Sequence, residues 1–226
     1  MRVSIHKHIP NPEQFKQQLL GWSQQFREVV FLDSNSYPQE YSSFNCMMAV
    51  DALTSLKTDF HNAFEDLKQY QQTTKDWLFG YLTYDLKNDV EDLKSSNFDG
   101  LDFPDLFFFQ PKKIFILKEN QLEIQYLLLC DDEVEEDFEE IVQSPKSKVQ
   151  SGETLEIEQR ISKEFYIEKV TQMLHHIHAG DMYEANFCME FFAENAIINP
   201  LEKFQKLNEI SQAPFSVFFK NHKQYL

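Results

Sequence analysis

A segment near the C-terminus is a candidate helix that ends at a glycine and continues directly into a candidate strand. Val170, Leu174 and Ile177 recur at i, i+4 and i+7, which places them on one face of an α-helix. Gly180 stands where the end of a helix needs a left-handed residue, so it predicts the helix stop. Apolar and polar residues then alternate over 183–190, which predicts a strand with two different faces. A helix joined so tightly to a strand favours a fold of mixed α and β structure.

Size and charge exclude several classes of protein. The chain has 226 residues, 42% of them hydrophobic, so it can bury a sizeable core as one domain or two small ones. Its 21 basic and 37 acidic residues give a net charge of −16. Nucleic acids and anionic membranes are bound by clustered Lys and Arg, so neither is an expected partner. No segment approaches the ~20 apolar residues of a membrane span, and the N-terminus lacks a signal-peptide pattern. We expect a soluble, cytoplasmic protein.

The residues alone define neither a catalytic site nor a metal site. Cys46, Cys130 and Cys188 are far apart and lie among apolar residues, which is typical of reduced, buried thiols. The three histidines of 175–178 spread around the predicted helix instead of sharing the i, i+4 face that paired zinc ligands use. No serine lies in a Gly-x-Ser-x-Gly turn, and no glycine-rich phosphate loop is present.

The N-terminal part predicts alternating helices and strands. Asn11 and Pro12 are typical of a helix N-cap and first turn, and Gln14 can close a capping box. Gly80 interrupts a strand pattern, which indicates a bulge or a close backbone approach. Residues 118–121 indicate a hairpin turn. The patterns predict a helix to about residue 26 and another at 59–71, with strands at 28–32, 44–50, 77–84, 107–109, 114–117 and 122–130.

Eight of the ten residues in 131–140 are acidic. Val134, Phe138 and Ile141 recur at helical spacing within and beside this run, so it predicts a helix with one buried stripe and a solvated acidic face. The next residues are rich in Ser, Lys and Gln and include Pro145, which is typical of a linker. We therefore predict three regions, namely 1–142, a linker at 143–160, and 161–226.

Five segments together carry a family resemblance. In chain order they are Phe31-Leu32-Asp33-Ser34, Tyr41-Ser42-Ser43-Phe44, Trp77 to Asp85, Ile177 to Asn186, and Gln212 to Phe219. They resemble the L-L-x-S, Y-S-R-F, G-x-x-G-Y-x-x-Y-D, I-x-x-G-D-x-Y-Q-x-N and A-P-F-S-A-F motifs of the chorismate-utilising enzymes. That family includes anthranilate synthase component I and aminodeoxychorismate synthase component I. One position departs, because Glu184 stands where the family usually has Gln. The order of the motifs identifies the chain as a member.

The resemblance implies a fold and a ligand pocket. The fold is α+β, with mostly antiparallel β-sheets in a sandwich-like arrangement and helices packed outside, as in the N-terminal portion of anthranilate synthase component I-like enzymes. Family motifs around a tryptophan pocket correspond here to Ser34, Tyr41, Ser42, Ser43, Phe44, Pro214, Phe215 and Ser216. Aromatic walls and hydroxyl groups suit an indole amino acid. Ser43 replaces a common arginine, so one charged partner of the ligand is missing. Packing around an empty or collapsed site is the alternative.

The resemblance also implies an activity. The chain is similar to the chorismate-aminating subunit of aminodeoxychorismate synthase, which acts on the path to 4-aminobenzoate and folate. The resemblance implies that the enzyme uses Mg²⁺ and takes ammonia from a glutamine amidotransferase subunit. Anthranilate synthase component I is the alternative enzyme. A non-catalytic module that binds an indole-type ligand or the amidotransferase is the alternative from another class. The family's catalytic and metal-binding segments correspond to positions beyond Leu226, so we expect no catalytic residue here and no activity from the 226 residues alone, whether a fragment or a natural truncation.

Overall fold

The computed structural model describes residues 1–38, 40, 43–144 and 155–226. They form two compact units, one of Met1–Val149 with Pro200–Leu226 and one of Gln150–Asn199. This division differs from the predicted region 161–226, because residues 200–226 belong to the first unit, where residues 216–221 pair with the N-terminal strand 28–33. Most of the predicted linker lies outside the described residues. Within those residues, no helix combines the length and apolar character needed to span a membrane.

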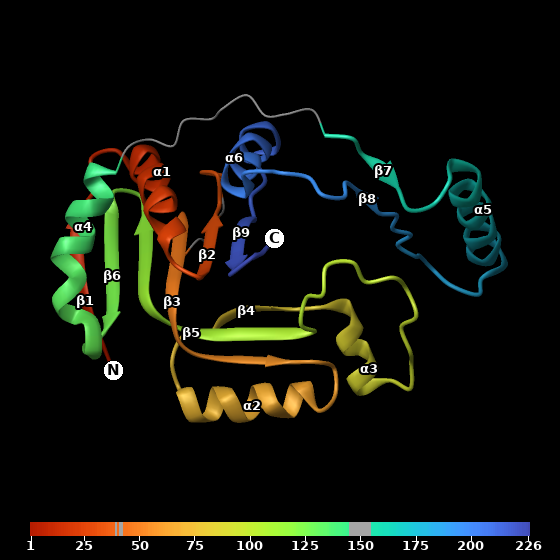
Figure 1. Cartoon of the computed structure of the whole chain (residues 1–226), viewed down its shortest axis with the longest axis horizontal. Helices are drawn as coiled ribbons and strands as arrows, with labels where there is room; N and C mark the ends of the chain where they lie inside the picture. Colours follow the sequence, from red (N-terminus) through yellow and green to blue (C-terminus); the bar gives the residue numbers. More distant parts are fainter. Residues whose placement is uncertain (39, 41–42, 145–154) are drawn as a thin grey trace. The chain divides into compact units, whose positions relative to one another are not determined.

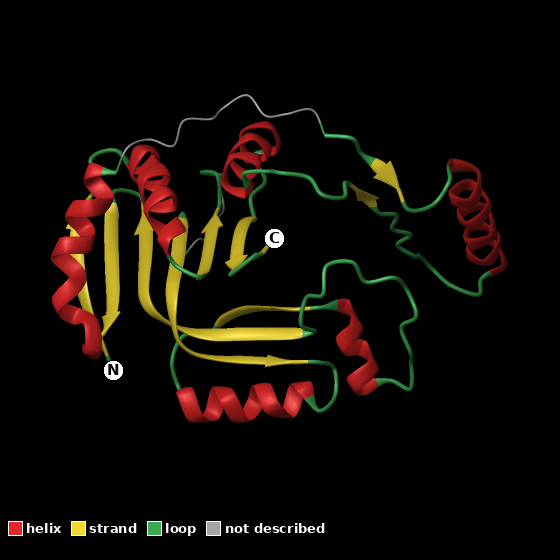
Figure 2. Ribbon diagram, viewed as in Figure 1, coloured by secondary structure: helices red, strands yellow, loops and turns green. Residues whose placement is uncertain are grey.

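The first unit is built on one eight-stranded sheet in which every described pair is antiparallel (Figures 1 and 2). Its order is β1-β6-β5-β3-β2-β9-β10, with β4 paired to β5. The strands are β1 Arg2–His8, β2 Glu28–Asp33, β3 Cys46–Thr58, β4 Phe79–Leu82, β5 Leu106–Lys118, β6 Gln121–Leu127, β9 Ser216–Asn221 and β10 Gln224–Tyr225. The helices are α1 Pro12–Trp22, α2 Ala63–Thr74, α3 Lys87–Val90, α4 Val134–Gln143 and α6 Pro200–Ser211.

The two long strands, β3 and β5, turn sharply halfway along their length (Figure 1). The register shifts between Ala52 and Thr54, and Asp51 has a φ of 61°, so β3 carries a bulge there. Pro111 of β5 lies opposite Ala52. A proline has no N–H for the ladder, and at a bulge the ladder is already interrupted. The two strands predicted at 107–109 and 114–117 are therefore one continuous strand.

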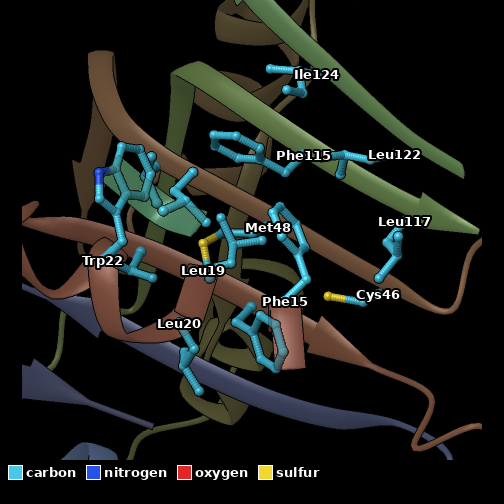
Figure 3. Close-up of a cluster of buried hydrophobic side chains, with 14 of the residues drawn as sticks. Phe15, Leu19, Leu20, Trp22, Cys46, Met48, Phe115, Leu117, Leu122 and Ile124 are labelled. Carbon is cyan, nitrogen blue, oxygen red and sulfur yellow. The ribbon is translucent and has the colours of Figure 1, made fainter. Parts of the chain in front are cut away.

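One face of the sheet carries the larger core, beneath α1 and α4 (Figure 3). Phe15, Leu19 and Trp22 of α1 are buried against strand residues such as Met48 and Phe115. The start of α1 is as predicted, since Asn11 Oδ1 accepts a hydrogen bond from the Gln14 N–H at 3.1 Å and Pro12 opens the helix. In α4, Val134 and Ile141 are buried and Phe138 packs against the same core, which confirms the predicted stripe.

The bend folds the sheet over a second core. Phe79, Phe107 and Phe109, from β4 and the first half of β5, pack with Val30 and Phe219 from β2 and β9. Strands on both sides of this cluster face one another, so the predicted sandwich-like arrangement arises from a single bent sheet. With helices on the outer surfaces, this confirms the α+β class. The predicted turn at 118–121 is also confirmed, since it joins β5 to β6.

The second unit contains α5 Lys163–Ala179 and the short strands β7 Glu158–Gln159 and β8 Phe191–Phe192. Gly180 ends α5 with a φ of 84°, and its N–H donates to the Ile177 carbonyl at 3.1 Å, so the predicted helix stop is confirmed. The strand predicted at 183–190 is wrong. A strand needs a ladder of hydrogen bonds to a neighbour. Within 183–190 the described backbone shows one such bond, from the Arg160 N–H to the Glu190 carbonyl, and the ladder itself joins 191–192 to 158–159.

Candidate functional site

Antiparallel pairing of β2 with β9 brings together two of the predicted site segments, which are about 180 residues apart in the sequence. Asp33 lies opposite Ser216, so the end of one motif meets the start of the other. The Asn35 side-chain amide donates to the Ala213 carbonyl at 2.7 Å. It also forms a reciprocal pair with the Asn208 amide, at 2.8 Å in both directions. These contacts fix the turn after β2 against the segment that enters β9.

The turn after β2 buries a hydroxyl group. Asn35 and Ser36 adopt left-handed conformations, with φ of 50° and 56°. The Ser34 N–H donates to the Asn45 carbonyl at 2.9 Å, which ties the turn to the start of β3. Ser34 is 8% exposed, and its Oγ has no hydrogen-bond partner among the described residues. A buried hydroxyl without a partner is costly, so a ligand that bonds Ser34 Oγ recovers that cost.

Strand alternation separates the two faces of β2. Phe31 packs into the larger core, whereas Leu32 packs on the second core together with Phe44. Ser34 is the first residue after the strand. We use the name β2–β9 site for Ser34, Phe44, Pro214, Phe215 and Ser216 with Tyr81, which is described below.

The remaining predicted residues differ in exposure. Phe215 is 81% exposed, which is unusual for a large aromatic side chain, while Pro214 and Ser216 are half-buried. Ser43 is exposed. Tyr41 and Ser42 lie outside the described residues. The structure thus places a buried hydroxyl and an exposed aromatic ring near the same end of the β2–β9 ladder. That these residues hold a ligand stays a prediction.

Tyr81 is a further candidate for the site that sequence reasoning missed. It follows Gly80 on β4, and its ring lies edge-on to Phe219 of β9 at 5.2 Å between centroids. Its hydroxyl is buried with no hydrogen-bond partner in the described chain. Burial, with a smaller contribution from Asp105, raises the pKa of Tyr81 to about 12. The hydroxyl therefore stays protonated and can donate to a ligand. The available signal was its place in the Gly80-Tyr81-x-x-Tyr84-Asp85 motif.

The Mg²⁺ that the resemblance implies stays a prediction. Across 1–38, 40, 43–144 and 155–226, no group of three or more His, Cys, Asp or Glu side chains is placed to hold a metal ion. His176 Nδ1 lies 2.7 Å from Asp181 Oδ2, so that histidine is held by a carboxylate at the end of α5.

The family described as chorismate binding enzyme matches residues 27–226. This match covers both motif segments of the β2–β9 site and most of the chain. The chain belongs to the chorismate binding enzyme family.

Two further similarities concern particular proteins. An "Anthranilate synthase component I-like protein" from Synechocystis sp. is 27% identical over 148 residues, which are 64% of this chain and 30% of that protein. The menaquinone-specific isochorismate synthase MenF of Escherichia coli is similar in structure, with a TM-score of 0.49 and 10% identity. That likeness covers 99% of this chain and 48% of that one. The chain therefore spans less than half the length of both proteins.

Proposed function

We propose that this chain is part of the chorismate-aminating component of an aminodeoxychorismate synthase, which makes the precursor of 4-aminobenzoate for folate synthesis. The complete protein takes chorismate and ammonia, the ammonia being supplied by a glutamine amidotransferase subunit, and uses Mg²⁺. The chain described here contributes the β2–β9 site, which holds tryptophan or a similar indole amino acid.

The observation that carries the proposal is the segment Ala213-Pro214-Phe215-Ser216 at the start of β9. It has the A-P-F-S form typical of aminodeoxychorismate synthases, where anthranilate synthases more often have N-P-S-P-Y-M. Tyr183, which follows Gly180-Asp181-Met182, supports the same choice, because anthranilate synthases often have Phe there. The family match over 27–226 supports a chorismate-utilising enzyme in general. Anthranilate synthase is the second candidate, and the similarity to the anthranilate synthase component I-like protein of Synechocystis favours it.

The reading frame that contains this chain tests the proposal. A frame that also encodes Ser-x-Ser-Pro-Glu-Arg-Phe and later Pro-Ile-Lys-Gly-Thr carries the family's catalytic segments and supports an enzyme. A stop codon directly after Leu226 contradicts it and favours a binding module without catalysis.

Tryptophan is expected to stabilise the 226-residue chain against heat. At a free concentration ten times the dissociation constant, binding to the folded state alone contributes about 1.4 kcal/mol, which corresponds to roughly 3–6 °C in a chain of this size. Ser34→Ala is expected to abolish this shift while leaving the unliganded melting temperature equal or higher, because it removes a buried hydroxyl that has no partner among the described residues. Differential scanning fluorimetry measures both quantities.

Two more variants make the result specific. Phe215→Ala is expected to remove the shift by removing an aromatic wall. Phe98→Ala is the matched control, because Phe98 is 69% exposed and lies on no element of the β2–β9 site. A shift that survives in Ser34→Ala and Phe215→Ala contradicts the site, as does the absence of a calorimetric signal at millimolar tryptophan.

A further inference from the structure

A cavity of about 560 Å³ lies on the other face of β2, between α1 and α6. It is separate from the β2–β9 site, since Phe31 and Asp33 line it whereas Leu32 and Ser34 do not. Its apolar wall comes from Leu20 of α1, Phe31 of β2 and Phe204 of α6. The rings of Phe31 and Phe204 meet edge-on at 6.2 Å between centroids. The other lining residues are polar or charged, so a ligand that fits here combines polar groups with an apolar body.

A buried ion pair stands at the polar end of this cavity. Lys16 and Asp33 are 5% and 7% exposed, and Lys16 Nζ lies 2.9 Å from Asp33 Oδ1. Lys16 Nζ also donates to Glu13 at 3.0 Å. Burial lowers the pKa of Lys16, but the interactions with Asp33 and Glu13 outweigh it and leave the pKa raised, so the amine is charged.

Only one of the two carboxylate oxygens of Asp33 accepts hydrogen bonds from the described residues. Its Oδ1 accepts from Lys16 Nζ and from the Asn35 N–H at 3.0 Å. Its Oδ2 accepts no hydrogen bond from any described residue, although the side chain is more than nine-tenths buried and lines the cavity. A carboxylate oxygen without a partner at the cavity wall can accept a hydrogen bond from a donor that enters the cavity.

The charges of the cavity select the ligand. Three acids, Glu13, Asp33 and Glu209, line it together with one base, Lys16. A dicarboxylate such as chorismate meets an excess of negative charge there, whereas an ammonium group meets acceptors. We propose that the cavity between α1 and α6 binds a small primary amine, whose ammonium bonds Asp33 Oδ2 near Glu13 and whose apolar body lies against Phe31 and Phe204.

A series of phenyl compounds that differ in charge tests the proposal on the 226-residue chain. 2-Phenylethylamine is expected to bind at millimolar concentration and to shift the side-chain amide signals of Asn35 and Asn208 in NMR spectra. The anion 3-phenylpropionate is expected to bind at least tenfold more weakly. Equal binding of the two compounds, or no shift at these amides with 10 mM amine, overturns the proposal.

Single substitutions of the acidic residues test which carboxylates bind the ammonium group of the ligand. Glu13→Gln is expected to weaken amine binding about two- to fivefold, since its side chain is 69% exposed and screened by solvent. Glu65→Gln is the control, because Glu65 likewise pairs with the lysine three residues later, at 3.1 Å, but lies on α2. Asp33→Asn is expected to weaken binding more than tenfold if the variant folds; if it does not fold, Glu13→Gln decides alone. Unchanged affinity in Glu13→Gln contradicts the proposal.

Discussion

Gly80→Ala is expected to destabilise the first unit by about 3–5 kcal/mol, a loss at the upper end of what single substitutions produce. A Cβ atom at Gly80 would lie 1.9 Å from the Phe107 carbonyl oxygen and 2.7 Å from the Phe108 Cα. Both are backbone atoms of β5, which pairs with β4 in register at this point, so no side-chain rotation relieves the clash. Urea unfolding followed by circular dichroism measures the loss.

Gly21→Ala is the control for the same chemical change. Gly21 lies in α1, and nothing lies within 4 Å of the position that its Cβ would take. Alanine is a better helix former than glycine, so this variant is expected to gain roughly 0.5–1 kcal/mol. If Gly80→Ala loses less than about 1 kcal/mol, β4 does not approach β5 as closely as described.

Asp76→Ala is expected to cost about 3 kcal/mol at pH 7, because it leaves the buried guanidinium of Arg2 without its carboxylate. Arg2 Nε and Nη2 each lie 2.9 Å from one oxygen of Asp76, and the two side chains are 9% and 16% exposed. Gln110 Nε2 donates to the same carboxylate at 2.8 Å. This network ties β1, the loop after α2, and β5 together. Thermal unfolding is expected to show a drop of roughly 6–12 °C.

The same carboxylate makes a pH-dependent contribution. Burial raises the pKa of Asp76, but the hydrogen bonds from Arg2 and Gln110 outweigh it and hold the pKa below the ordinary value of 3.8. The stabilisation is therefore fully present above that ordinary value and is lost as the pH falls through the lowered one. The difference between wild type and Asp76→Ala is expected to be constant from pH 5 to 7 and to shrink below about pH 4.

A more exposed ion pair controls for general charge effects. Lys112 Nζ and Asp51 Oδ2 lie 2.9 Å apart with side chains 28% and 31% exposed. Asp51→Asn removes the charge and tolerates the left-handed backbone at this position, so it is expected to cost under about 1 kcal/mol, since water screens the pair. Equal losses in the two variants would contradict the buried character of the Arg2–Asp76 pair.

The sequence predicted the helix ends that are fixed by capping residues. Asn11 and Pro12 start α1, and Gly180 ends α5, because capping needs only neighbouring residues. The close approach expected at Gly80 is confirmed as well. Strand β1 was missed, because Val3 and Ile5 alternate with polar and basic residues, and its pairing with β6 is visible only in three dimensions. The strands predicted at 107–109 and 114–117 are a single strand, because β5 continues through Pro111 at the bulge of its neighbour β3.

The candidate site also depends on strand pairing that the sequence does not reveal. The family resemblance named both segments, but no periodicity predicts that Ser216 lies opposite Asp33. That contact depends on the pairing of two strands distant in the chain. Tyr81 was missed because its role depends on burial of its hydroxyl between β4 and β9. The cavity between α1 and α6 was likewise invisible, since its residues come from three separate elements.

Product identity tests the proposed function most directly. The complete protein that contains this chain is to be incubated with chorismate, ammonium and Mg²⁺, and the product identified by chromatography and mass spectrometry. We predict 4-amino-4-deoxychorismate, and no product from the 226-residue chain alone. Anthranilate or isochorismate as the main product, or conversion of chorismate by the 226 residues alone, would contradict the proposal.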